Sequence, residues 1–153
     1  MRRSRSSIIA LLLLADATGA QADWRNTKWD MSVEQVAALF DGAVPITRLI
    51  PALGEPDLRA QLYAKPTPDQ KATFYFRAGR LARVDVEYAD VRQCPDALRQ
   101  LREQYGPPLA IEKTYEVLTV FTWFSGRDEI VLRWVDSGNG QGLCSSVQKK
   151  AFG

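Results

Sequence analysis

The sequence has 153 residues, two cysteines, no histidine and a formal net charge of +2. A chain without histidine cannot use a Ser-His-Asp or Cys-His catalytic mechanism, and it lacks the commonest protein ligand for zinc. Its 20 basic residues are scattered, whereas binding to nucleic-acid phosphates requires lysines and arginines clustered on one surface. We therefore expect neither a histidine-dependent enzyme nor a nucleic-acid-binding protein.

The first 22 residues have the three parts of an export signal. Arginines at positions 2, 3 and 5 form a positive n-region, Ile8–Ala15 form an apolar h-region, and Ala20–Ala22 form a small-residue cleavage site. The apolar run is far shorter than the roughly 20 residues of a membrane-spanning helix, so we expect no membrane span. The pattern predicts a signal peptide, cleaved at about Ala22, and a periplasmic or secreted protein. The Arg2-Arg3 pair leaves open whether general secretion or the twin-arginine route is used.

Removal of this leader leaves residues 23–153, which we expect to form one domain with its own core. Three arginines and Asp16 are lost with the leader, so 17 basic and 17 acidic residues remain and the net charge falls to zero. Cys94 and Cys144 are the two cysteines, and in an oxidising compartment we expect them to form one disulfide. The alternative, a redox-active thiol, would need a CxxC-like pattern or an exposed cysteine beside a positive helix end.

Local patterns predict the first helix after Ser32. Ser32 and Gln35 have the spacing of a capping box, and apolar residues follow at positions 33, 36, 37 and 40 on one helical face. The segment Ile46–Leu53 is ambiguous because prolines lie at positions 45 and 51. The next predicted elements are an edge strand at Leu58–Ala64 and a hairpin of Ala72–Arg77 with Leu81–Tyr88.

The second helix is predicted to start at Cys94, where Pro95 and Asp96 suit a first helical turn, and to stop at Gly106. Three strands follow, at Lys113–Phe124 (long, bent or split), Glu129–Val135 and Leu143–Gln148. A weak internal repeat relates Phe76–Arg80 to Phe124–Arg127. We therefore predict an α+β fold of two tandem helix-then-strands units that share one antiparallel sheet, with the helices packed on one face.

Four motifs stand out along the chain. Trp29–Val36 fits the pattern W-G-M-S-x-E-x-V, with Asp30 at the glycine position, and Phe74–Val84 fits F-x-F-x-x-G-x-L-x-x-V. A cysteine before a helix ending in Y-G-x-P and a late cysteine complete the set, which resembles a group of uncharacterised proteobacterial periplasmic proteins. More distantly, the order of elements is similar to the tandem αβ fold of β-lactamase inhibitory proteins and of small outer-membrane-assembly lipoproteins, whose lipid-anchored cysteine is missing here. The resemblance implies that the protein binds other proteins and is not a catalyst.

The candidate interaction surface is the sheet face that does not pack on the helices. Arg83, Asp85 and Glu87 alternate along one predicted strand and therefore share a face. Tyr75 points opposite its two phenylalanine neighbours, and the segment before residue 124 is apolar on both faces. We predict an interaction surface made of these four residues together with Trp29, Phe121 and Trp123. The alternative is that the sheet curls, or the N-terminal segment folds back, and covers the aromatic residues.

Two classes of function are compatible with these features. The first is a soluble, non-catalytic protein-binding or envelope-accessory module that has an unknown protein partner and needs no cofactor or metal. Its sharper form is an inhibitor of a periplasmic or secreted enzyme. The second is a small-ligand carrier, or a hydrolase that uses Asp85 and Glu87, because carboxylates two residues apart on a strand lie about 7 Å apart. A flat or concave exposed face favours binding, whereas an enclosed pocket with converging carboxylates favours catalysis.

Overall fold

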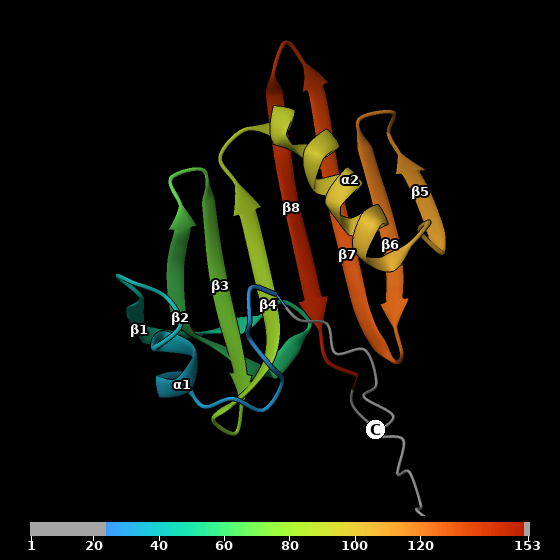
Figure 1. Ribbon diagram of the computed structural model, residues 1–153. Helices are drawn as coiled ribbons and strands as arrows, with labels where there is room; N and C mark the ends of the chain where they lie inside the picture. Colours follow the sequence, from blue (N-terminus) through green and yellow to red (C-terminus); the bar gives the residue numbers. More distant parts are fainter. Residues whose placement is uncertain (1–23, 152–153) are drawn as a thin grey trace, which may run out of the picture.

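The computed structural model describes residues 24–151, so the predicted leader lies outside the described residues. These residues form one eight-stranded antiparallel sheet in the order β1-β2-β3-β4-β8-β7-β6-β5 (Figure 1). The strands are β1 (Val44–Ala52), β2 (Glu55–Thr67), β3 (Gln70–Arg77), β4 (Arg80–Tyr88), β5 (Ala110–Thr114), β6 (Leu118–Ser125), β7 (Asp128–Gly138) and β8 (Gln141–Lys149). The helical segments are α1 (Val33–Ala37), the 3-10 helix η1 (Val91–Gln93) and α2 (Cys94–Tyr105).

The predicted α+β class is wrong, because the fold is mainly β. The helix α1 has only 5 residues and α2 has 12, so the helices do not form a layer over the sheet. The strands are more numerous and longer than expected: β2 has 13 residues, and the ambiguous segment before it is a strand as well. Backbone pairing along these long strands recruits residues whose local sequence reads as turn or loop.

Within the described residues, a helical segment precedes four strands in each half of the chain. The two sets of four strands meet where β4 pairs with β8, and the sheet runs outward from this central pair to β1 at one edge and β5 at the other. The sheet therefore joins the two halves of the chain through continuous backbone hydrogen bonding rather than through side chains alone.

Local signals set several element limits as predicted. The Ser32 hydroxyl accepts a hydrogen bond from the backbone of Gln35 at 3.3 Å, and the Gln35 side chain accepts one from the backbone of Ser32 at 2.8 Å, which confirms the capping box. Gly106 ends α2 with a φ of 80°, a conformation that glycine adopts without strain. The hairpin of β3 and β4 is also confirmed, and its turn residues Ala78 and Gly79 both have positive φ.

Other boundaries differ from the prediction. The segment predicted as an edge strand lies inside the sheet as part of β2, because β1 pairs outside it. The prolines of β1 are compatible with this edge position, where a missing N–H breaks no ladder. The long predicted strand at Lys113–Phe124 divides into β5 and β6, because Tyr115 and Glu116 take positive φ in the turn between them.

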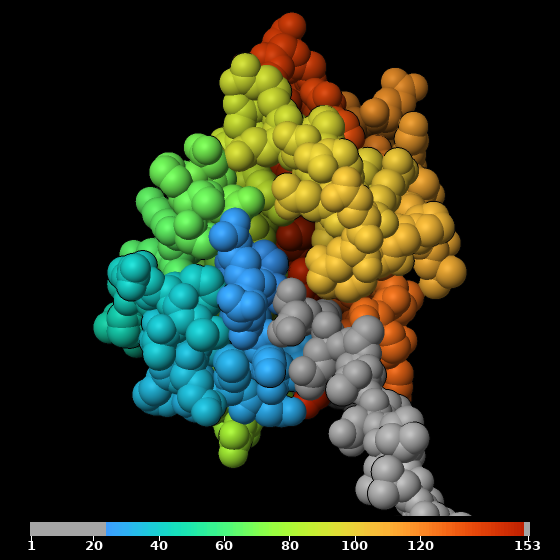
Figure 2. Space-filling model, in the orientation of Figure 1, coloured from blue at the N-terminus to red at the C-terminus, as the bar shows by residue number. Residues whose placement is uncertain are grey.

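The main core lies on one face of the sheet, called here the core face. Paired residues of neighbouring strands share a face, and one row on this face joins Phe74, Val84, Gln148, Ile130 and Trp123. These side chains are almost completely buried, and Val36 of α1 and Leu101 of α2 belong to the same cluster. Figure 2 shows this side of the molecule, with α2 in yellow and the segment that begins at residue 24 in blue.

Candidate functional site

The opposite face of the sheet, called here the second face, carries rows of side chains that cross the strands. The first row joins Leu118, Val135 and Leu143. The next two rows join Val120, Arg133, Ser145, Glu87 and Lys71, and then Thr122, Val131, Val147, Asp85 and Thr73. The last row joins Phe124, Glu129, Lys149, Arg83 and Tyr75. The β6–β8 part of this face is therefore mainly apolar, and the β3–β4 part is mainly charged.

Arg83 is the centre of the charged part. Its Nε donates to Asp85 Oδ1 at 2.6 Å, and its Nη2 donates to Asp85 Oδ2 at 2.7 Å. Its third nitrogen, Nη1, lies 3.4 Å from Glu55 Oε1, and the guanidinium lies over the Tyr75 ring, 5.2 Å from its centre. Lys149 Nζ reaches the same Glu55 oxygen at 2.9 Å. These five residues, called here the Arg83 cluster, come from β2, β3, β4 and β8.

Burial strengthens the electrostatic coupling within the Arg83 cluster. The side chains of Arg83 and Asp85 are only 13% and 21% exposed. The hydrogen bonds to Asp85 raise the pKa of the Arg83 guanidinium. Burial, and then the negative charge of Asp85, raise the pKa of the Tyr75 hydroxyl. Both Asp85 oxygens accept from Arg83, whereas a general acid or base needs an oxygen that meets the substrate.

The end of the β1–β2 hairpin covers part of the second face. Ala52, Leu58 and Ala82 form a small second core, and Tyr75 packs against it. The register of β2 shifts between Ala60 and Leu62, which places Ala60 opposite Tyr75 on the second face. The alternative prediction, that the sheet curls over its aromatic residues, therefore applies to Tyr75.

The structure brings together four of the seven residues predicted for the interaction surface. Tyr75, Arg83, Asp85 and Glu87 share the second face, where exposed Glu87 lies 3.9 Å from Lys71 across the strand pair. The other three residues are in the core and cannot belong to that surface. Trp29 is only 8% exposed, Phe121 7% and Trp123 1%.

The buried tryptophans have defined structural partners. Trp123 Nε1 donates to the carbonyl oxygen of Gly106 at 2.9 Å, and Trp29 Nε1 donates to Asp128 at 2.6 Å. Alternate side chains of β6 point to opposite faces of the sheet, and both sets are apolar. The sequence pattern therefore does not indicate which set faces the core. The half-exposed aromatic residue of this strand is Phe124, which points to the second face.

Sequence patterns also missed Glu55, Lys149 and Leu143. Glu55 lies in a segment that reads as a turn, and no local signal indicates its contact with Arg83, 28 residues later. Lys149 lies beyond the predicted end of its strand. Leu143 is 50% exposed although it belongs to a strand, and a strand pattern alone does not distinguish an exposed leucine from a buried one.

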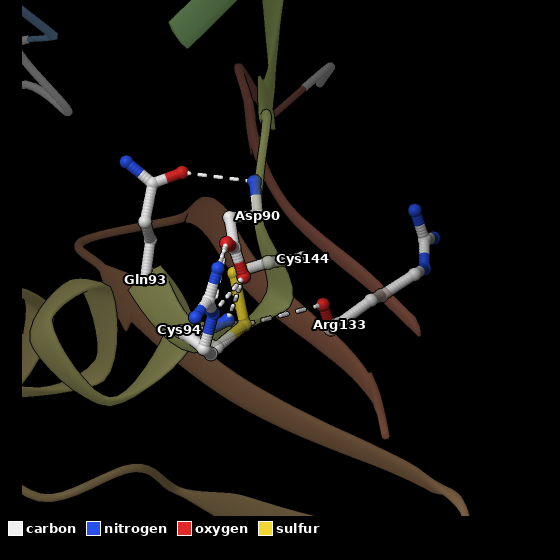
Figure 3. The surroundings of a disulfide bond; sticks show 6 residues. Asp90, Gln93, Cys94, Arg133 and Cys144 are labelled. Atoms are coloured by element: carbon white, nitrogen blue, oxygen red, sulfur yellow. Dashed lines mark hydrogen bonds and ion pairs between the residues drawn. A yellow bond between two sulfur atoms is a disulfide. The ribbon is translucent and has the colours of Figure 1, made fainter. Parts of the chain in front are cut away.

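The predicted disulfide is confirmed and joins Cys94, at the start of α2, to Cys144 of β8 (Figure 3). Both cysteines are fully buried. Next to the bridge, Asp90 accepts a hydrogen bond from the backbone of Arg92 at 2.8 Å, and Gln93 accepts one from the backbone of Asp90 at 3.1 Å (Figure 3). The bridge thus attaches the start of α2 to the sheet, and its burial argues against a redox-active thiol, which needs access.

Comparisons with known proteins identify no relative. A scan against protein-family models found no match, and searches of curated proteins and of solved structures found no significant match. Within residues 24–151, no group of three or more His, Cys, Asp or Glu side chains is placed to hold a metal ion. No helix in the same range is long and apolar enough to cross a bilayer. The geometry of the second face is therefore the main basis for a functional proposal.

Proposed function

We propose that this protein is a non-catalytic periplasmic module that binds another protein on the second face of its sheet. Two features support the compartment. The first 22 residues have the pattern of an export signal, and Cys94 and Cys144 form a disulfide, a bond that persists in oxidising compartments. The apolar side chains exposed on the second face support the binding role.

The observation that carries the proposal is the exposure of apolar side chains on β6 and β8. Phe124 and Leu143 are each 50% exposed on the second face. Val131 and Val147 provide a buried floor between them, and exposed Arg133 stands among the apolar residues. Aromatic and arginine side chains around an apolar centre are the composition found at the energetic centres of protein interfaces.

The size of the apolar part indicates a central contact rather than a complete interface. Four rows along three strands span about 20 Å by about 15 Å, from the rise per residue and the strand spacing. A stable interface buries roughly 800 Å² on each partner, more than this patch offers. A partner would therefore also cover neighbouring charged residues, including Lys149 and Glu129. These two residues border a surface hollow of about 410 Å³ beside Phe124.

The geometry does not support a hydrolase that uses Asp85 and Glu87 as its catalytic carboxylates. Asp85 is occupied by two hydrogen bonds from Arg83, and Glu87 stands in the open on the sheet surface. These two residues share a face but do not converge on an enclosed pocket among the described hollows. The second face is therefore better suited to contact with a large surface than to enclosing a small substrate.

The test compares three variants with the wild type. Phe124→Asp and Leu143→Asp place a carboxylate on the second face, and Leu39→Asp is the matched control, because Leu39 is 41% exposed beside the core-face residue Phe40. Each protein, exported and purified, is immobilised and exposed to a periplasmic extract, and captured proteins are quantified by mass spectrometry. Thermal unfolding confirms that the variants fold.

We expect one or more proteins to be enriched by the wild type and by Leu39→Asp, and to fall at least about tenfold with Phe124→Asp and Leu143→Asp, as expected for central contacts. If the captured protein is an enzyme, added wild-type protein tests the inhibitor form through loss of that enzyme's activity. Equal capture by all four proteins, or none by any, would contradict the proposal.

A further inference from the structure

The two edges of the sheet differ in their ability to accept another strand. In β1 the register shifts between Pro45 and Ile50 and again after Pro51, and both prolines lack an N–H. In β5, by contrast, all five residues pair with β6 without a shift and none is a proline. An edge strand of this regular kind presents alternate N–H and C=O groups that a further strand can pair with.

The β5 edge also carries exposed apolar side chains. Ile111 of β5 is 51% exposed, Leu109 just before the strand is 76% exposed, and Tyr115 in the turn just after it is 89% exposed. Figure 1 shows β5 at the outer edge of the sheet, next to β6. Isolated apolar residues on a surface are ordinary, but three of them along one unpaired edge provide side-chain contacts for an added strand.

A hollow of about 430 Å³ adjoins β5 on the core face. Ile111, Phe121 and Trp134 supply its apolar lining. Its charged lining residues are Lys113, Glu116 and Asp136, so two carboxylates stand against one ammonium group. In addition, the indole nitrogen of Trp134 is buried without a hydrogen-bond partner among the described residues. The hollow is therefore apolar at its base and negative at its border.

From these features we infer that β5 docks an extended segment of another polypeptide, which joins the sheet as a ninth strand. Apolar side chains at alternate positions of that segment would face the hollow beside Ile111. A basic side chain would lie next to Glu116 and Asp136, because these give the border a negative charge. The backbone supplies affinity and the alternate side chains supply selectivity, as in other strand-addition complexes.

A second copy of this chain fits β5 less well than a different segment. Antiparallel self-pairing that keeps the two core faces aligned places one residue of β5 opposite its own copy. Pairing centred on Glu112, Lys113 or Thr114 opposes like charges, the last because it places Glu112 opposite Glu116. Pairing centred on Ile111 opposes Lys113 to Leu109, and pairing centred on Ala110 opposes the strand to Pro107 and Pro108, which lack an N–H. A basic segment with alternating apolar residues avoids each of these conflicts.

The probe is an acetylated, fluorescent peptide, Lys-Thr-Val-Thr-Val-Thr-Lys, whose alternation places its two valines and both terminal lysines on one face. Its matched control has the same side chains but N-methylated alternate amides, which cannot pair with an edge strand. Binding to the full chain is measured by fluorescence anisotropy. Hydrogen exchange by NMR then reports the protection of residues 110–114.

We expect the unmethylated peptide to bind and protect β5, and the N-methylated peptide to bind at least about tenfold more weakly. Ile111→Lys and the double variant Glu116→Lys/Asp136→Lys should each lose binding by a similar factor. Phe124→Asp should leave it unchanged, which separates this site from the one on the second face. Either no binding up to about 1 mM, equal binding of the two peptides, or a chain dimer abolished by Ile111→Lys would overturn the inference.

Discussion

Removal of the disulfide should cost about 4 kcal/mol of unfolding free energy. Cys94 and Cys144 are separated by 50 residues, and the bridge restricts the unfolded chain by closing this loop. The loop-closure relation gives an entropy loss of about 14 cal/mol/K for a loop of that length, or about 4 kcal/mol at 25 °C. Domains of this size have a total stability of about 5–15 kcal/mol, so the bridge supplies a large share.

The assay is urea unfolding of the oxidised wild type, the reduced wild type and the double variant Cys94→Ala/Cys144→Ala. With a slope of about 2 kcal/mol/M, a loss of 4 kcal/mol lowers the midpoint by about 2 M. The reduced wild type keeps both buried sulfur atoms and serves as the control for their packing. A loss below about 1 kcal/mol in the reduced protein would refute the loop-closure reasoning, since the loop ends would then be held together without the bond.

Three further predictions concern single side chains. Gly142→Ala should lower the free energy of unfolding, measured in urea, by more than about 3 kcal/mol, because the new Cβ would lie 1.9 Å from a backbone oxygen of β7. Gly140→Ala is the control and should lower it by only about 1 kcal/mol, because its Cβ would have no neighbour nearer than 3.9 Å. Equal losses would contradict this reasoning. Trp123→Phe should cost about 2–3 kcal/mol in the same assay through lost volume and a lost hydrogen bond, and a negligible loss would argue against its burial. Burial and Asp85 raise the pKa of Tyr75, so the stability from its neutral hydroxyl is present below pH 10 and is lost as the pH rises through the folded-state pKa. Asp85→Asn should lower that pKa, as measured by NMR of labelled tyrosine, and an upward shift would show that Asp85 is not a cause.

Features with local causes could be predicted from the sequence. The capping box at Ser32, the β3–β4 hairpin and the end of α2 at Gly106 depend on residues within a few positions of one another. The alternation of Arg83, Asp85 and Glu87 was also correctly placed on one sheet face, because the side-chain period of a strand is two. These features are therefore determined by interactions between residues that are close together in the sequence.

Features with distant causes could not be predicted. The helix-then-strands order predicts an α+β class, but a helix signal does not give the length of the strands that follow it. The apolar residues of β6 gave two equally apolar faces, and only packing decided that Trp123 is buried and Phe124 half exposed. Glu55 joined the Arg83 cluster through a curled hairpin that no local pattern indicates.

By itself, the sequence determined the disulfide partners, the limits of α2, the β3–β4 hairpin and the face shared by Arg83, Asp85 and Glu87. The disulfide follows because the chain has only two cysteines, and caps, turns and strand alternation follow from residues that are close together in the sequence. Only the tertiary structure decided the mainly β class, the edge position of β5 and the exposure of Phe124 and Leu143. These depend on which strands lie side by side and which face receives the core, and that choice results from the free energy of packing over the whole chain.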